Sequence, residues 1–284
     1  MSRKKVTILD IQKRKQTNVP ITMLTAYDFA AAVLVDKADI DIILVGDSLG
    51  MVMLGYSGTT QVTMEEMLHH CKAVAKGTTA ALLVGDMPFL SYQADKAEAV
   101  RNAGRFLKEA AMECVKVEGG REIASTIKAI VQAGIPVMGH IGLTPQTVSQ
   151  LGGFRIQGKT AASAQALLED ALALQEAGCF AIVLEAVPAP VATKISQRLT
   201  IPTIGIGAGV GCDGQVLVYH DMLGLYDRLQ PRFVKQFGAI GEAVTTAVQT
   251  YSEEVRNRTF PAEEHTYPMS EAEEAAFLAA VAGR

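Results

Sequence analysis

The chain has 284 residues, of which 49% are hydrophobic and 20% charged, and its net charge is −4. This size allows a large buried core in one domain or two. The acidic balance excludes an electrostatic case for binding nucleic acid or an anionic membrane surface. We expect no membrane span, because no apolar run reaches the roughly 18 residues that one needs. We also expect no signal peptide, because Asp10, Lys13 and Arg14 interrupt the first apolar stretch.

The predicted elements begin with a helix at about Ile8–Arg14, which could cover the floor of a barrel. After it, short apolar runs alternate with helix-like segments. In the eight runs, odd and even positions are both apolar, which is typical of parallel strands buried on both faces. They are Ile21–Thr25, Ile40–Val45, Ala81–Gly85, Cys114–Val117, Pro136–Ile141, Cys179–Leu184, Pro202–Ile206 and Gln215–Tyr219. The predicted helices are Phe29–Lys37, Met64–Lys76, Asp95–Met112, Arg121–Gln132, Ala162–Glu176, Val191–Leu199 and a last one over Arg232–Val255.

Eight strand–helix units favour an α/β fold of the (β/α)₈ type, a TIM barrel with an N-terminal helix. An open, doubly wound sheet is the alternative, but no GxGxxG follows the first strand. No linker or repeat interrupts the pattern. The sequence therefore predicts one barrel domain over residues 1–268 and a tail over residues 269–284 that is helical or disordered.

Four predicted strands end in carboxylates, at Asp47, Asp86, Glu118 and Glu185. In a barrel these strand ends converge on one mouth, where active sites lie. A single Asp after a strand is most often a helix cap or a turn residue. Four carboxylates at buried strand ends are costly to desolvate unless they are paired or bind a metal. Their convergence predicts a functional site.

The residue types indicate which metal such a site would bind. Asp47, Asp86 and Glu118 offer hard carboxylate oxygens with no cysteine or pair of histidines beside them. Such a set suits Mg²⁺, which keeps several water positions that a chelating substrate can take. Zinc is disfavoured, because its catalytic sites usually include histidine or cysteine.

Further polar residues are predicted to line the same mouth. Lys116 shares its strand face with Glu118, so it could bind a substrate carboxylate, neutralise the metal carboxylates, or both. Ser48 could donate a hydrogen bond to the same substrate. Glu185 suits a general base in an apolar mouth, with a fourth metal ligand or a helix-cap anion as the alternatives. His140 either lines the site or is a satisfied core residue.

Two loops also suggest ligand contacts. The segment 142–159 is long for a connection between strand and helix, and long loops of this kind are often lids or binding segments. Gly205–Gly209 is glycine-rich, so it could bind phosphate or let a ligand approach the backbone.

These residues stand in stretches that together resemble the ketopantoate hydroxymethyltransferases, also named 3-methyl-2-oxobutanoate hydroxymethyltransferases. The resemblance runs from about residue 5 to about residue 267. It is carried by Thr-Ala-Tyr-Asp at 25–28, Val-Gly-Asp-Ser-Leu-Gly-Met at 45–51, Asp-Met-Pro-Phe at 86–89, Val-Lys-Val-Glu-Gly-Gly at 115–120, Gly-His-Ile-Gly-Leu-Thr-Pro-Gln at 139–146, Leu-Glu at 184–185, Ile-Gly-Ile-Gly-Ala-Gly at 204–209 and Glu-Glu-His at 263–265.

The resemblance implies a (β/α)₈ barrel in which Asp47, Asp86 and Glu118 hold one Mg²⁺. It implies that Asp47, Ser48, Asp86 and Lys116 contact an α-keto acid and that Glu185 is the proton acceptor. The implied reaction moves a one-carbon unit from 5,10-methylenetetrahydrofolate to 3-methyl-2-oxobutanoate through a metal-stabilised enolate. The product would be 2-dehydropantoate, on the route to pantothenate. A cytoplasmic homo-oligomer, typically a decamer, is also implied.

Two other readings stay open from the residues alone. One is a different Mg²⁺-enolate barrel, such as an isocitrate-lyase-like enzyme or a phosphoenolpyruvate mutase relative, although the chain lacks a Lys-Lys-Cys-Gly-His segment. The other is a catalytically silent barrel that serves in binding or assembly. The presence of all four strand-end carboxylates and of Lys116 argues against the second reading.

Overall fold

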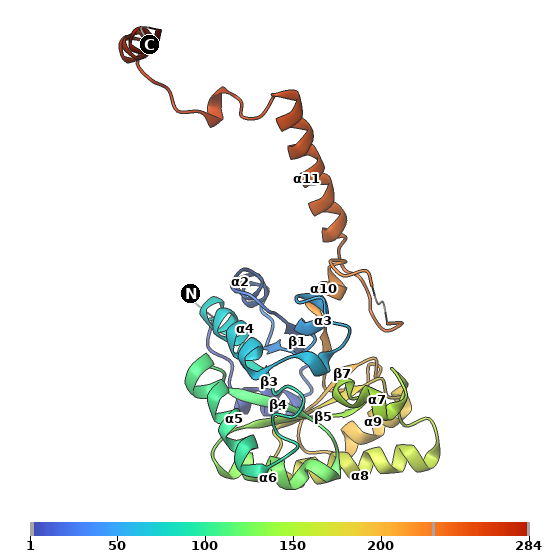
Figure 1. Ribbon diagram of the computed structural model, residues 1–284. Coiled ribbons are helices and arrows are strands. Elements are labelled where there is room, and N and C mark those ends of the chain that lie inside the picture. Colours follow the sequence, from blue (N-terminus) through green and yellow to red (C-terminus); the bar gives the residue numbers. More distant parts are fainter. Residues whose placement is uncertain (1–2, 229–230, 283–284) are drawn as a thin grey trace. The chain divides into compact units, whose positions relative to one another are not determined.

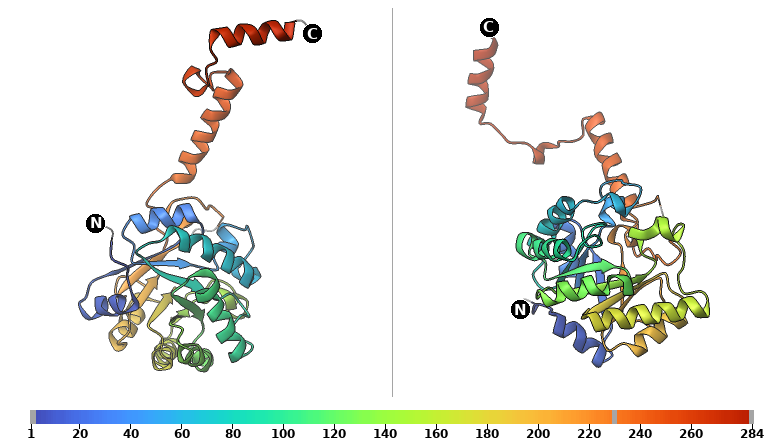
Figure 2. Two further views of the ribbon diagram at one scale, coloured as in Figure 1. Left: turned by 90° about the vertical axis from the view of Figure 1, so that its left-hand side faces the viewer. Right: turned by 60° about the horizontal axis from the view of Figure 1, so that its bottom comes forward.

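The computed structural model describes residues 3–228 and 231–282. It divides into two compact units, Met1–Phe237 and Gly238–Arg284. The first unit contains the barrel (Figure 1 and Figure 2). The prediction of a domain boundary at residue 268 stays a prediction. None of the described helices is long and apolar enough to span a membrane.

The first unit is a closed barrel of eight parallel strands that pair in chain order, and β1 pairs with β8. This arrangement confirms the predicted TIM barrel. The strands are β1 Ile21–Thr25, β2 Ile42–Val45, β3 Leu82–Asp86, β4 Cys114–Glu118, β5 Val137–Gly142, β6 Ala181–Glu185, β7 Thr203–Ile206 and β8 Gly214–Leu217.

The helices lie around the barrel (Figure 2). They are α1 Ile8–Gln16, α2 Phe29–Lys37, α3 Leu49–Val52, α4 Met64–Gly77, α5 Lys96–Ala110, α6 Ala124–Gln132, α7 Val148–Leu151, α8 Ala161–Ala177, α9 Ala189–Arg198 and α10 Tyr219–Met222, with short 3₁₀ turns at η1 Thr59–Gln61, η2 Arg121–Ile123 and η3 Pro145–Thr147. The predicted start of the helix at Met64 is confirmed, and Thr63 is its N-cap residue. Its hydroxyl accepts from the Glu66 N–H, and the Glu66 carboxylate accepts from the Thr63 N–H.

Successive side chains of each strand point to opposite faces of the sheet, so they form two separate hydrophobic cores. Every second side chain points into the barrel, where Leu82, Val84 and Met138 belong to the interior cluster. The fully buried Ile11 of α1 belongs to the same cluster, so this helix covers one end of the barrel interior. The other side chains, including that of Leu83 in β3, pack outward against the helices.

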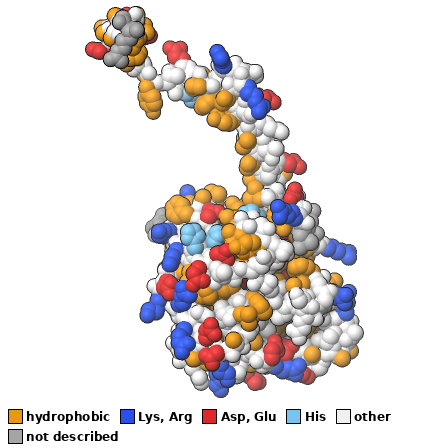
Figure 3. All heavy atoms as spheres, in the orientation of Figure 1, with side chains coloured by type: hydrophobic (Ala, Val, Ile, Leu, Met, Phe, Trp, Pro, Cys, Tyr) orange, Lys and Arg blue, Asp and Glu red, His pale blue; other side chains and the backbone are white. Residues whose placement is uncertain are grey.

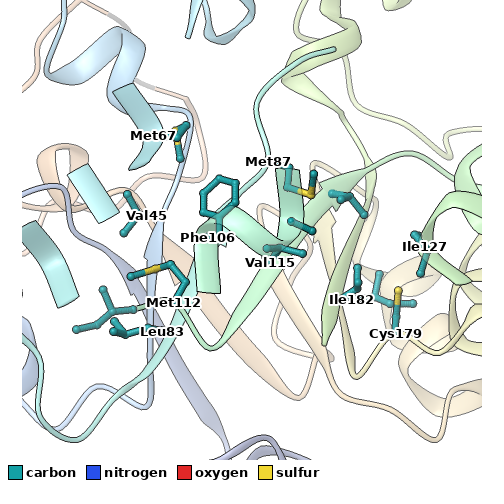
Figure 4. Packing of buried hydrophobic residues seen from close by; sticks show 14 of the residues in the cluster. Val45, Met67, Leu83, Met87, Phe106, Met112, Val115, Ile127, Cys179 and Ile182 are labelled. Carbon is teal, nitrogen blue, oxygen red and sulfur yellow. The ribbon is translucent and has the colours of Figure 1, made fainter. Parts of the chain in front are cut away.

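The outer core is tightly packed where α5 meets β3 (Figure 4). Phe106 is fully buried in the cluster that contains Met67, Met112 and Val115. A Cβ built on Gly85 would lie 2.4 Å from the Phe106 ring, so glycine at this position lets the helix approach the strand. This contact fixes the distance between α5 and the strand that ends in Asp86.

The last helix was predicted to begin at Arg232, and this predicted start is wrong. The chain makes turns after Pro231, and helix α11 begins only at Ile240 and ends at Asn257. The physical reason is tertiary: Phe233 packs over Gly207, where a Cβ would lie 2.6 Å from its ring. This contact holds the segment out of helical conformation.

The second unit contains α11, the 3₁₀ turn η4 Glu263–His265 and α12 Glu271–Ala282. One face of α11 exposes apolar side chains at helical spacing, and orange side chains follow this helix in Figure 3. They are Ile240, Val244, Val248, Tyr251 and Val255.

We expect Phe106→Ala to lower the free energy of unfolding by about 3–5 kcal/mol, because it leaves a cavity between α5 and β3. Phe29→Ala is the matched control, since 54% of the Phe29 side chain is exposed. Denaturant unfolding of both variants measures the difference. Equal losses in the two variants would contradict the packing described here.

Candidate active site at the carboxyl end of the barrel

A cavity of about 710 Å³ opens at the carboxyl ends of the strands. It has the volume of a typical small-molecule site. Every residue that the sequence predicted for the site lines it: Asp47, Ser48, Asp86, Lys116, Glu118, His140 and Glu185. The structure thus brings together side chains that are up to 138 positions apart in the chain, from Asp47 to Glu185 (185 − 47).

Strand register explains how these side chains meet. The side chains of β3 that point into the barrel are those of Leu82, Val84 and Asp86. In β4 they are those of Cys114, Lys116 and Glu118. Asp86 pairs with Lys116 across β3 and β4, and Glu118 pairs with His140 across β4 and β5. The barrel interior therefore changes from apolar to charged toward its carboxyl end.

The charged layer at this end of the barrel consists of Asp86, Lys116, Glu118, His140 and Glu185, and Lys116 lies at its centre. Its Nζ is 2.8 Å from Asp86 Oδ1 and 3.4 Å from Glu118 Oε1, and all three side chains are buried. Burial alone would lower the pKa of Lys116, but the carboxylates of Asp86, Glu118 and Asp47 outweigh it and raise the pKa. The ammonium therefore stays charged, so the predicted neutralisation of the carboxylates by Lys116 is observed.

The three strand-end carboxylates differ in how well they are compensated. Burial, together with repulsion from Asp86 and Glu118, raises the pKa of Asp47. Burial also raises the pKa of Asp86, despite the nearby Lys116. For Glu118, burial is outweighed by Lys116 and His140, which lower its pKa to about 2. Nearby positive charge thus compensates the carboxylates of Asp47 and Asp86 less well than that of Glu118.

His140 connects Glu118 to Glu185. Its Nδ1 lies 3.3 Å from Glu118 Oε1, and its Nε2 lies 3.3 Å from Glu185 Oε2 without hydrogen-bond alignment. Burial and Lys116 lower the pKa of His140, but the two carboxylates outweigh them and raise it to about 9. The imidazole is therefore protonated at neutral pH and holds Glu185 at the edge of the cluster.

The donor set fits a divalent cation. Four buried or nearly buried carboxylates lie beside two basic side chains, Lys116 and His140, so acidic groups outnumber basic groups in this cluster. Within the described residues, no group of three or more His, Cys, Asp or Glu side chains is arranged to hold a metal ion. Mg²⁺ does not require such a cage, because it usually binds one or two carboxylates and completes its shell with water and substrate.

Ser48 is positioned by a neighbouring side chain. Its Oγ lies 2.8 Å from the hydroxyl of the buried Tyr27, at the start of α3 and beside Asp47. Tyr27 follows β1, so this hydrogen bond ties the loop after β2 to the adjacent strand end. The serine is therefore held in the cavity wall.

The sequence profile described as ketopantoate hydroxymethyltransferase matches residues 5–263. The chain belongs to this family. It is 56% identical over 265 residues to the 3-methyl-2-oxobutanoate hydroxymethyltransferase of Moorella thermoacetica, which covers 93% of this chain and 98% of the relative. The enzyme of that name from Heliobacterium modesticaldum is 56% identical over 268 residues, covering 94% and 97%. The predicted family is confirmed, and the chain is a hydroxymethyltransferase enzyme.

Solved structures of low sequence identity share the fold. Phosphoenolpyruvate phosphomutase from Streptomyces platensis subsp. rosaceus superposes with a TM-score of 0.59 at 17% identity and covers 96% of each chain. A phosphonopyruvate hydrolase complex with oxalate and Mg²⁺ gives a TM-score of 0.60 at 13% identity, with 98% and 99% covered. These likenesses show the same barrel architecture.

Gln146, which no sequence pattern indicated as a site residue, organises the ketopantoate hydroxymethyltransferase site from the long loop after β5. Its Nε2 donates to Asp47 Oδ2 at 3.0 Å and to the Met87 carbonyl at 2.9 Å, and its backbone N–H donates to Glu118 Oε2 at 3.0 Å. The Tyr92 hydroxyl donates to its Oε1 at 2.7 Å. The only sequence signal was its place in Leu-Thr-Pro-Gln, a stretch treated as part of a loop.

We expect Gln146→Glu to lower kcat by roughly 10- to 100-fold, because it replaces a donor to Asp47 with a repelling carboxylate next to Asp47 and Glu118. Steady-state kinetics of this near-isosteric variant measure the effect. Gln197→Glu on the exposed surface of α9 is the matched control. Wild-type kcat in Gln146→Glu would show that the amide does not position the carboxylates.

Proposed function

We propose that the chain transfers a hydroxymethyl group from 5,10-methylenetetrahydrofolate to 3-methyl-2-oxobutanoate, giving 2-dehydropantoate, and that the reaction requires one Mg²⁺ per subunit. Family membership supports the transfer itself. The observation that carries the metal requirement is the buried cluster in which four carboxylates lie beside only two basic side chains.

We propose Asp47, Asp86 and Glu118 as the metal-holding residues. Among the described residues no hydrogen bond reaches Asp47 Oδ1, and Asp86 Oδ1 has only its contact with Lys116. Both residues line the cavity from neighbouring strand ends. When bound, Mg²⁺ supplies Lewis-acid polarisation of the keto carbonyl.

The remaining residues would bind the keto acid and move its proton. The Lys116 ammonium, held between Asp86 and Glu118, attracts the carboxylate of the substrate, and Ser48 donates a hydrogen bond to it. Glu185 removes the proton from C3 of the keto acid, because 15% of its side chain is exposed to the cavity, whereas the side chains of Asp86 and Glu118 are 2% and 1% exposed. His140 orients Glu185 for this transfer.

The transfer balances with water as a reactant. Loss of the C3 proton gives an enolate, which attacks the one-carbon unit at the oxidation level of formaldehyde. Water supplies the hydroxyl group, and tetrahydrofolate leaves. The buried, fixed charges around the keto group are already in place for the negative charge that develops there. By family resemblance we further propose that the chain works as a cytoplasmic homo-oligomer, a homodecamer.

The exchange of the C3 hydrogen of 3-methyl-2-oxobutanoate with D₂O, followed by NMR, tests the base. We expect Mg²⁺-dependent exchange by the wild type and a rate lower by about 10²- to 10⁴-fold in Glu185→Gln. Glu176→Gln, an exposed residue of α8, is the matched control. Absence of exchange by the wild type, with or without tetrahydrofolate, would overturn the assignment of the keto acid.

Asp47→Asn tests the metal site through stability. Because the pKa of Asp47 is raised, its charge destabilises the metal-free fold, so the neutral variant should melt higher than the metal-free wild type. Added Mg²⁺ should raise the melting temperature of the wild type but not of the variant. Asp39→Asn, with an exposed carboxylate, is the control. Equal stabilisation of wild type and Asp47→Asn by Mg²⁺ would place the metal elsewhere.

A further inference from the structure

The outer part of the cavity differs in chemistry from the charged layer below it. Its wall includes Phe154, Arg155 and Ile156 from the loop after β5, and Arg232 and Phe233 from the turns after α10. Phe154 and Ile156 are more than half exposed, whereas Asp86 and Glu118 are almost completely buried. The cavity therefore has a charged inner end and an apolar, aromatic outer end.

The cavity is larger than the keto acid needs. A branched five-carbon acid fills only part of about 710 Å³, which suits a ligand of drug size. The charged layer accounts for the carboxylate and keto groups of the small substrate. The outer aromatic end is therefore available for a second, larger and flatter molecule.

Tertiary contacts hold both segments of the outer end. Phe233 lies on Gly207, which has a positive φ of 64° and has no room for a side chain. On the opposite loop, the Gln157 N–H donates to the Ala186 carbonyl at 3.0 Å, directly after Glu185. This bond ties the loop that carries Phe154 and Arg155 to the strand end that carries the proposed base.

Two arginines at the outer end have no carboxylate partner among the residues that the structure describes. Arg155 and Arg232 are both exposed, line the cavity and form none of the chain's salt bridges. Arg3, Arg14 and Arg121 each pair with an acidic side chain, whereas Arg101 and Arg198 also have no such partner among the described residues but lie outside the cavity. Guanidinium groups without partners at the rim of a site suit an anionic ligand with carboxylates.

We propose that Phe154, Arg155, Arg232 and Phe233 form the binding subsite for the one-carbon donor. The flat rings of the folate pack against the two phenylalanines, and the carboxylates of its glutamate tail bind the two arginines. This inference rests on the proposed function, in which a folate carries the one-carbon unit. Its reacting end then points inward toward Glu185, and its anionic tail points toward solvent.

The test measures KM for 5,10-methylenetetrahydrofolate and for 3-methyl-2-oxobutanoate in Arg155→Ala, Arg232→Ala and the double variant. Because exposed ion pairs are weak, we expect each single variant to raise KM for the folate by roughly 3- to 5-fold, and the double variant by about 10-fold. KM for the keto acid and its exchange with D₂O should stay at wild-type values. Arg101→Ala, exposed on α5 and outside the cavity, is the matched control.

The second arm removes the tail instead of the arginines. With 5,10-methylenetetrahydropteroate, which lacks glutamate, the wild type should show a raised KM, and the double arginine variant should show no further rise. Phe154→Ala should raise KM for both donors, because its ring contacts the part that they share.

The outcomes separate this proposal from the proposed function. Folate-dependent turnover with an unchanged folate KM in the double variant overturns the subsite and leaves the reaction standing. The subsite is also overturned if removal of the glutamate tail raises KM for the donor as much in the double arginine variant as in the wild type. Exchange of the keto acid without any folate-dependent turnover in the wild type overturns the folate as donor, and the subsite with it.

Discussion

The structure depends on keeping charged groups buried at one end of an otherwise apolar barrel. Carboxylates removed from water are strongly destabilising unless they are compensated. Here Lys116 lies within 3.4 Å of Asp86 and Glu118, and His140 lies between Glu118 and Glu185. This compensation is incomplete at Asp47 and Asp86, which supports the proposal that the site binds a cation.

The rest of the barrel serves to hold these groups in place. Outward-facing glycines such as Gly85 let helices pack closely on the strands, so the strand ends cannot shift independently. Gln146 then ties Asp47 and Glu118 together through the loop after β5. A preorganised arrangement of this kind favours charge development on a bound keto acid without further rearrangement.

The two ends of the cavity divide the work of recognition between strands and loops. The charged layer lies on β3, β4, β5 and β6, where backbone pairing leaves little freedom. The aromatic and cationic outer end lies on two connecting segments, where we propose that the larger donor binds. A reaction between two substrates of unequal size fits such a division.

The sequence by itself determined the barrel and the residues of the charged layer, because both follow from local patterns: eight apolar runs, and carboxylates where those runs end. The tertiary structure decided which of those groups compensate one another, since a distance such as that from His140 to Glu185 depends on register across strands. It also decided the role of Gln146 and the non-helical start of the segment before α11. A lone glutamine in a loop and a phenylalanine over a distant glycine carry no periodic signal, so only the folded chain shows what they contact.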